Sequence, residues 1–279
     1  MKGRHSRLRA GLAVALALLA LASCQGPFAP QAALDGEAPA RSATGKSGVM
    51  MQGFYWDVPA GGTWYDTMKS KAAGLANMAG GYGIDAIWFP PASKTDNGAY
   101  SMGYDPFDYY DLGQLNQKGS IETRFGSQAE LKSAIATFKS YGIASMADIV
   151  LNHRSGGLSE YNPRTGSNTW TNFSAALSGK SLWHWDSFHP NNYHAADSGV
   201  FGGFPDVCYS AGSAYTDTKT WMNWLKSTTN AGFVQWRFDV ERVVRAMTTP
   251  EGPVTVQLQS TGDGVRARTW GPGTAWLLP

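Results

Sequence analysis

The chain has 279 residues, of which 43% are apolar and only 16% are charged. This length fits one large domain, and the composition excludes disordered and fibrous proteins. No apolar run of 18 or more residues follows the N-terminal segment, which excludes a polytopic membrane protein. The formal net charge of +2 includes four basic residues among the first nine positions and becomes −2 without them. Nucleic acid is therefore not an expected partner.

Residues 1–24 are typical of a secretory signal peptide, with a basic head, an apolar stretch and small residues before Cys24. Leu21 to Cys24 (Leu-Ala-Ser-Cys) resembles a bacterial lipoprotein box, in which the cysteine carries the lipid; an ordinary signal cleaved elsewhere is the alternative. We expect an exported protein, either a cell-envelope lipoprotein anchored at Cys24 or a secreted one. With Cys24 lipidated, Cys208 has no intramolecular partner, so no disulfide framework is expected. Residues 25–47 are rich in Ala, Gly, Ser and Pro and predict a flexible linker.

From Gly48 onward, short apolar segments alternate with segments of helical periodicity. Ser127 and Glu130 form the sequence of a capping box at one helix start. The alternation predicts an α/β fold with a parallel sheet, and the long excursion at 154–212 favours a (β/α)8 TIM barrel over a compact doubly wound sheet. Four β/α units by themselves leave other α/β folds open. We expect strands at 49–54, 84–89, 143–151 and 233–239, and helices at 63–78, 127–141 and 215–226.

Arg237 and Asp239 close the fourth expected strand. Alternation along a strand places both on one face, with Trp236 and Phe238 on the other. A neighbouring guanidinium keeps a carboxylate ionised, as a carboxylate nucleophile requires. The alternative is a buried ion pair that fixes strand register. The position at the carboxyl end of a strand favours chemistry.

The third expected strand ends in Asn152 and His153. An Asn oxygen suits a hard cation such as Ca²⁺, and a His can hydrogen-bond a ligand hydroxyl. Strict alternation puts the two side chains on opposite faces, so both can serve one site only if the strand curls there. A capping or packing role for His153 remains the alternative.

The run from Gly103 to Asp111 interleaves three acids with four aromatics after the second expected strand. Aromatic faces stack on the C–H surfaces of sugars, and carboxylates accept hydrogen bonds from hydroxyls. The alternative is a turn whose aspartates cap backbone amides, since Asp-Pro is common in turns.

Taken together, six ordered motifs between Val49 and Asp239 resemble the α-amylases, the (β/α) barrel family of retaining α-glucan hydrolases, in their bacterial and plant-like branch. The motifs begin at Gln52, Ile87, Gly103, Asp148, Gly202 and Trp236.

The resemblance implies roles for individual residues. Asp239 is similar to the catalytic nucleophile of the family, and Arg237 to the arginine that orients it. Tyr104, His153 and Trp56 resemble substrate contacts. Asn152 resembles a ligand of a structural Ca²⁺, and Asp206 is the expected second ligand.

The resemblance also implies a domain organisation. Residues 48–153 correspond to the first three barrel strands, 154–212 to the small domain B, and 213–245 to a helix and the fourth strand. Residues 246–279 read as an aberrant tail without family resemblance or regular structure. We consider Val254 to Gln257 as a fifth strand with Gln257 in place of the acid, but too few residues precede it for a helix and its loops.

Retaining hydrolysis needs a second carboxyl group as general acid, and no glutamate of the chain stands where the family has one. The sequence therefore suggests a truncated or frame-shifted amylase, a half barrel of impaired activity toward α-1,4-glucans. A non-catalytic glucan-binding lipoprotein, a barrel transglycosylase or isomerase, and a non-functional fragment are the alternatives. We expect a monomer. The six glutamates are Glu37, Glu122, Glu130, Glu160, Glu241 and Glu251.

Overall fold

The computed structural model describes residues 48–77, 83–192, 203–209 and 212–239, together with the backbone of four short C-terminal strands. The expected signal peptide, the linker and Cys24 lie outside the described residues. No helix in these ranges combines the length and the apolar character that crossing a membrane requires.

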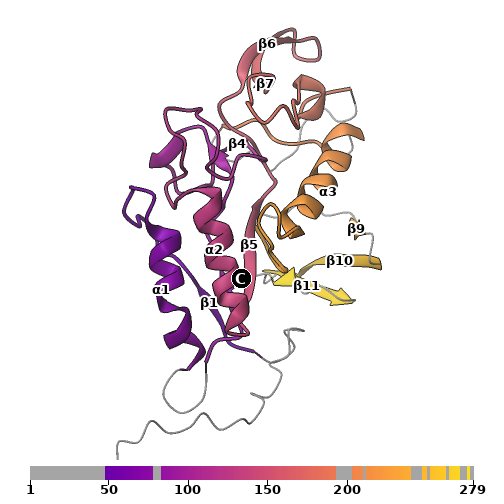
Figure 1. The fold of residues 1–279 in the computed structure, drawn as a ribbon. Helices are drawn as coiled ribbons and strands as arrows, with labels where there is room; N and C mark the ends of the chain where they lie inside the picture. The colour runs from indigo at the N-terminus through magenta and orange to yellow at the C-terminus, as the bar shows by residue number, and fades with distance from the viewer. Residues whose placement is uncertain are drawn as a thin grey trace, which may run out of the picture. The chain divides into compact units, whose positions relative to one another are not determined.

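A five-stranded sheet forms the centre of the described fold, in the order β1-β2-β5-β8-β12. Figure 1 shows the fold, with strands β1 and β5 of this sheet labelled. All neighbouring pairs in it are parallel. The predicted parallel α/β architecture is thereby confirmed. The five strands are β1 (Met50–Gln52), β2 (Ala86–Trp88), β5 (Ala144–Val150), β8 (Gln235–Asp239) and β12 (Ala275–Trp276).

Three helices follow the first strands in the order that the alternation predicts: α1 (Trp64–Ala76), α2 (Gln128–Ser140) and α3 (Gly212–Lys226). The capping box at the start of α2 is present, with Ser127 and Glu130 bonding each other's backbone amides. The buried residues of α2 recur at helical spacing, so one stripe of the helix packs inward. They are Leu131, Ala134, Ile135 and Phe138.

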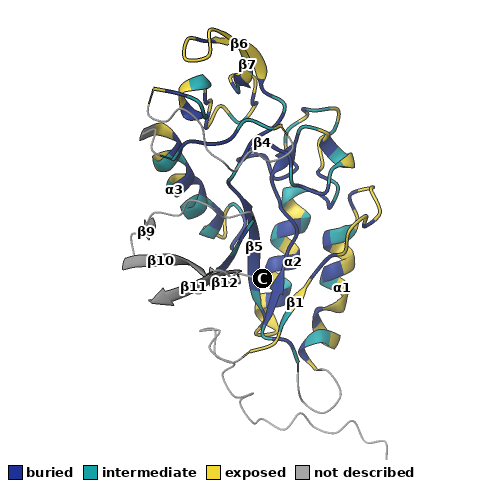
Figure 2. Ribbon diagram, turned by 180° about the vertical axis from the view of Figure 1, so that it is seen from behind, coloured by how far each residue is buried: buried dark blue, intermediate teal, exposed yellow. Residues whose placement is uncertain are grey.

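Aromatic rings fill the core between the helices and the sheet. Phe89, directly after β2, lies 5.8 Å from Phe138 of α2 and 5.6 Å from Phe233, both edge to face. Its ring centroid also lies 6.3 Å from that of Tyr65 of α1. Strand β5 is buried from Ser145 to Val150 (Figure 2). This core fixes the strands whose carboxyl ends carry the polar side chains described below.

The loops after β2 and β5 contain short elements of their own. After β2, β3 (Lys94–Thr95) pairs antiparallel with β4 (Pro106–Asp108), with the 3₁₀ turn Gly98–Tyr100 between them. After β5, the excursion holds a hairpin of β6 (Leu158–Asn162) and β7 (Ser167–Asn172), followed by the 3₁₀ turn Trp185–Ser187. Loop was expected in both regions. The sequences of β6 and β7, rich in Ser, Thr and Asn, carry little of the apolar alternation that predicts a strand.

The C-terminal segment, expected to lack regular structure, also contains strands. β9 (Met247–Thr249), β10 (Gly252–Thr261) and β11 (Gly264–Trp270) form an antiparallel sheet in the order β11-β10-β9. Alternating β-branched and polar residues in 254–257 suit such a strand. β10 pairs with β9 and β11, and β12 is the strand beside β8, so 254–257 is not a fifth strand of the parallel sheet.

Candidate active site

Two adjacent parallel strands, β5 and β8, bring three charged side chains together near their carboxyl ends. Asp148 is in register with Arg237, and Val150 with Asp239. Arg237 Nη1 donates to Asp148 Oδ1 at 2.9 Å and to Asp239 Oδ1 at 2.7 Å. One guanidinium therefore bridges two carboxylates, and the expected pairing of Arg237 with Asp239 on one face of the strand is present. Carboxylates on both sides raise the pKa of Arg237 although burial works to lower it, so its charge is permanent.

Asp148 is the most enclosed member of this cluster, with a side chain that is 0% exposed. Its Oδ2 accepts hydrogen bonds from Tyr104 Oη at 2.8 Å and Trp88 Nε1 at 3.0 Å. Burial raises the pKa of Asp148 to about 6, against the opposing effect of Arg237. Asp148 was not among the site residues that the sequence predicted. A single carboxylate within a buried, mostly apolar strand was the signal that could have identified it.

An aromatic wall stands beside the charged cluster. The rings of Tyr104 and Trp56 stack with centroids 5.9 Å apart and planes inclined by 23°. Trp56 is 66% exposed, so this wall faces solvent. The Arg237 guanidinium lies 4.7 Å from the ring centroid of Trp88, in cation–π geometry. Burial and the neighbouring Asp148 raise the pKa of Tyr104, which keeps its hydroxyl a donor to that carboxylate.

His153 lies behind this wall rather than on it. Strand β5 ends at Val150, so strict alternation does not extend to His153. The residue is 0% exposed, its Nε2 is 2.7 Å from the backbone oxygen of Tyr104, and its ring stacks on Phe204 at 5.2 Å. In this position it supports the backbone of Tyr104, which is the packing role left open above, and its contact with substrate remains a prediction.

The two expected calcium ligands are brought close together. The backbone oxygen of Asn152 accepts from Val207 N at 2.9 Å, and His153 forms a β-bridge with Asp206. Asp206 Oδ2 is also paired with His189 Nδ1 at 2.9 Å. Their oxygens fit the chemistry of a hard cation but amount to two side-chain donors, whereas Ca²⁺ takes six to eight. Within the described ranges, no group of three or more His, Cys, Asp or Glu side chains could hold a metal ion.

The acidic run after β2 turns mostly inward. Asp105 accepts from Asn97, Asp108 from Gln117 and Ser178, and Asp111 from the amides of residues 113–115. Turn and loop chemistry therefore accounts for the three acids. Tyr104 is the member of the run that reaches the charged cluster.

Comparison with known proteins agrees with these motifs. The family described as "Alpha amylase, catalytic domain" matches residues 79–271, a range that extends past residue 246, where the sequence analysis placed the end of the resemblance. The cytoplasmic alpha-amylase of Escherichia coli is 41% identical over 108 residues, or 39% of this chain and 21% of that protein. The glucan 1,4-alpha-maltohexaosidase of Bacillus sp. is 38% identical over 112 residues, or 40% of this chain and 21% of that protein.

Among solved structures, an alpha-amylase from Lactobacillus plantarum aligns with a TM-score of 0.47 and 15% identity, covering 71% of this chain and 39% of that one. The chain spans about a fifth of the length of these two curated relatives. The expected fold class is confirmed, with the parallel sheet and its helices corresponding to the N-terminal half of a (β/α)8 barrel. Because the catalytic-domain family matches residues 79–271, more than half of this chain, the chain belongs to the alpha-amylase family.

Proposed function

We propose that the chain belongs to a glycoside hydrolase that cleaves α-1,4-glucosidic bonds of starch or glycogen with retention of configuration. The observation that carries this proposal is the Arg237–Asp239 pair near the carboxyl end of β8, connected through Arg237 to the buried Asp148. A carboxylate nucleophile must be ionised and held in place, and a permanently charged guanidinium at 2.7 Å does both.

In this mechanism the Asp239 carboxylate attacks the anomeric carbon of the sugar. The glycosidic bond breaks, its electron pair leaves with the glycosidic oxygen, and a glycosyl ester forms on Asp239. Water then hydrolyses the ester and restores the carboxylate. Arg237 orients Asp239, and Asp148 holds Arg237 in turn. The Tyr104–Trp56 wall supplies the apolar face on which a glucose ring can stack.

The departing oxygen needs a proton from a second carboxyl group about 5–5.5 Å from the nucleophile. Two of the three glutamates among the described residues have engaged carboxylates: Glu130 in the capping box, and Glu160, which accepts from His184 and Trp185. The third, Glu122, is an exposed loop residue whose backbone carbonyl accepts from Lys94. We infer that this chain by itself turns over α-glucan weakly or not at all.

The engaged carboxylates of Glu130 and Glu160 favour a second candidate, a non-catalytic glucan-binding protein that uses Tyr104, Trp56 and His153. Both candidates share the α-glucan partner and differ in turnover. We further propose export with lipidation at Cys24 or secretion, and a monomeric state. Ca²⁺ bound through Asn152 and Asp206 would join the start of the excursion to its end, a structural contribution separate from the chemistry.

One experiment separates the candidates. Release of reducing ends from soluble starch and binding of maltoheptaose are measured on the purified protein, on Asp239→Asn and on Tyr104→Ala. A hydrolase loses turnover with Asp239→Asn, whereas a binding protein shows no turnover in any form and keeps maltoheptaose affinity in Asp239→Asn. Loss of affinity in Tyr104→Ala is expected for both. Starch hydrolysis that is unchanged in Asp239→Asn would contradict the nucleophile assignment.

A further inference from the structure

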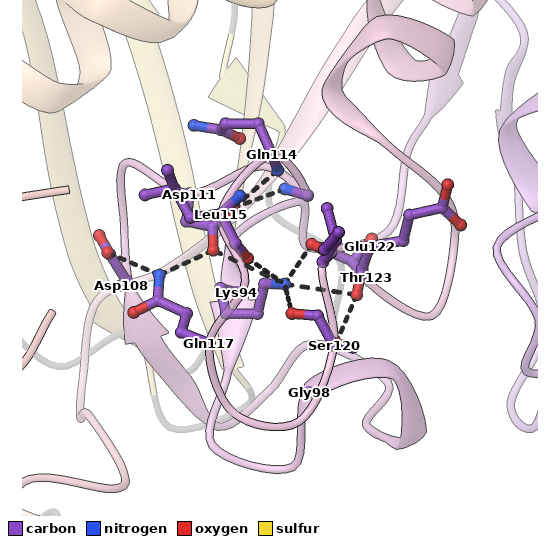
Figure 3. A network of polar contacts seen from close by, with 12 residues as sticks. Lys94, Gly98, Asp108, Asp111, Gln114, Leu115, Gln117, Ser120, Glu122 and Thr123 are labelled. Atoms are coloured by element: carbon purple, nitrogen blue, oxygen red, sulfur yellow. Dashed lines mark hydrogen bonds and ion pairs between the residues drawn. The ribbon is translucent and has the colours of Figure 1, made fainter. Parts of the chain in front are cut away.

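Outside the charged cluster, strand β3 also buries a positive charge, that of Lys94. The Lys94 side chain is 0% exposed. Its ammonium donates to the backbone oxygens of Ser120 at 2.9 Å, Leu115 at 3.3 Å and Glu122 at 3.4 Å, and also to that of Ile121. Figure 3 shows these oxygens converging on the Lys94 nitrogen.

A carboxylate completes this oxygen cage. Asp111 Oδ2 lies 3.6 Å from Lys94 Nζ and also accepts from Gln117 Nε2 at 2.7 Å. The other oxygen of Asp111 accepts from the amides of Gly113, Gln114 and Leu115. The loop from residue 111 to 122 therefore turns amides toward the Asp111 carboxylate and carbonyls toward the Lys94 ammonium. Backbone carbonyls and a carboxylate are also the ligands that hard metal cations take in protein loops.

The loop that surrounds Lys94, residues 111–124, is connected to the aromatic wall of Trp56 and Tyr104. Lys94 lies in register with Asp108 in the β3–β4 pair, and Tyr104 comes two residues before β4. At the far end of the loop, Arg124 Nε donates to Val58 O at 2.7 Å and Arg124 Nη1 to Tyr100 O at 2.6 Å. Val58 is two residues from Trp56. The loop thus contacts the segments that carry both rings of the wall.

We propose that Lys94 is an internal cation that does for the 111–124 loop what a bound metal ion does in other loops, and that it is thereby a positioning residue for the Trp56–Tyr104 pair. A buried ammonium is strongly stabilised only when polar groups surround it, so loop and lysine order each other. The lysine acts through its charge, at the centre of four carbonyl dipoles and one carboxylate. The positioning part of the proposal rests on the proposed function, since the wall matters through glucan binding.

The experiment tests whether the positive charge of Lys94, and not the shape of its side chain, orders the loop. Lys94→Ala leaves a hole with the shape of propylammonium, and 1-propanol has nearly that shape without the charge. Hydrogen exchange of peptides covering 111–124 is measured by mass spectrometry in wild type and in Lys94→Ala. Each protein is measured with propylammonium, with 1-propanol and without an additive. Lys139→Ala, an exposed lysine of α2, is the matched control.

We expect Lys94→Ala to speed exchange in 111–124 by about tenfold or more, because removal of the cation leaves several buried carbonyls without a donor. Exchange in α1 should stay as in wild type. Propylammonium should restore slow exchange and 1-propanol should not. Maltoheptaose affinity, measured by calorimetry, should fall in Lys94→Ala and recover with propylammonium alone.

Unchanged loop exchange in Lys94→Ala, or equal restoration by 1-propanol, would overturn the cation proposal. A loosened loop with undiminished maltoheptaose affinity would overturn the positioning part. If wild type binds no maltoheptaose, the proposed function fails, and the exchange comparison decides the role of Lys94 by itself. If Lys94→Ala does not fold, the yield of refolded soluble protein is compared with the two additives, and equal yields contradict the proposal.

Discussion

At the scale of single residues, the described site is organised by one buried carboxyl group, Asp148. Three donors converge on it: Arg237, Tyr104 and Trp88. Arg237 belongs to strand β8, Tyr104 to the aromatic wall and Trp88 to the neighbouring strand β2. Asp239, the residue expected to react, is therefore connected to Asp148 indirectly, because both carboxylates accept hydrogen bonds from Arg237.

The raised pKa of Asp148 predicts how stability depends on pH. A pKa of about 6 in the folded protein exceeds the value of an unfolded Asp, so the folded state binds the proton more tightly. The stabilisation that the Asp148 carboxyl group adds to the free energy of unfolding is fully present below about pH 4 and is lost as pH rises through about 6. Relative to wild type, Asp148→Asn should therefore gain about 2–3 kcal/mol in free energy of unfolding between pH 4 and pH 7.

Urea denaturation of wild type and Asp148→Asn at several pH values checks this. Asn keeps the size of the side chain and does not titrate, so the difference between the two proteins isolates Asp148. If the free energy of unfolding of the wild type instead rose with pH relative to that of Asp148→Asn, Arg237 would be holding the pKa of Asp148 below its ordinary value.

At the scale of elements, the sequence predicted the strands and helices of the main sheet because their burial is periodic. Expected strands at 84–89, 143–151 and 233–239 contain β2, β5 and β8, each with slightly narrower bounds. The hairpin β6–β7 was missed, since its inward face is held by hydrogen bonds such as Thr171 Oγ1 to Glu160 Oε1 and not by apolar side chains.

The sequence predicted those features of the site that depend on residues close together in the chain. Alternation along β8 was enough to pair Arg237 with Asp239. The positions of Asp148 and His153 depend on contacts between distant segments, with Tyr104 and Phe204 respectively. Spacing within one strand carries no information about such partners, so neither the hydrogen bonds of Asp148 nor the packing of His153 on Phe204 could be predicted from it.

The capping box of α2 gives a prediction at this scale. Ser127 N donates to Glu130 Oε2 at 2.7 Å, and Glu130 N donates to Ser127 Oγ at 3.3 Å. Ser127→Ala should lower the free energy of unfolding by about 1 kcal/mol, because the amide of Glu130 loses its acceptor. Ser140→Ala, at the other end of α2, is the control and should cost less. Equal losses measured by urea denaturation would show that the cap contributes nothing of its own.

Arg154 gives a second prediction, concerning how the excursion after β5 is attached. Its guanidinium is fully buried, lies 3.8 Å from the ring centroid of Phe173, and donates to the carbonyls of Ser181 and Phe107. Burial lowers the pKa of Arg154 to about 10, so the cation persists at neutral pH. Arg154→Met should lower the free energy of unfolding by about 2–4 kcal/mol, since two buried carbonyls lose their donor.

The matched control is Arg164→Met in the exposed turn between β6 and β7, which should change stability by less than about 0.5 kcal/mol. Hydrogen exchange should also rise in the segment around Phe173 and Ser181 in Arg154→Met. A variant as stable as wild type would mean that the aromatic cage packs equally well around methionine, as buried ion replacements sometimes do.

At the scale of the whole described fold, one loop encloses a buried cation of the chain and a second segment is proposed to bind a cation. Lys94 fills an oxygen cage in the loop after β2, while Asn152 and Asp206 bring two hard donors together where the excursion after β5 begins and ends. One site carries its positive charge within the chain, and the other is proposed to take it from solution. Stability of the first should be independent of free metal, and that of the second should depend on it.

Calcium removal tests this distinction. If Ca²⁺ binds through Asn152 and Asp206, binding to the folded state stabilises by mass action, and about 100 times the dissociation constant gives roughly 2.7 kcal/mol. The melting temperature should then rise with added Ca²⁺ and fall with EDTA, and Asp206→Asn should abolish both responses. Asp186→Asn, another aspartate of the excursion, is the control and should respond as wild type does. A melting temperature indifferent to Ca²⁺ and EDTA would leave the His189–Asp206 pair, at 2.9 Å, as what holds this part of the excursion.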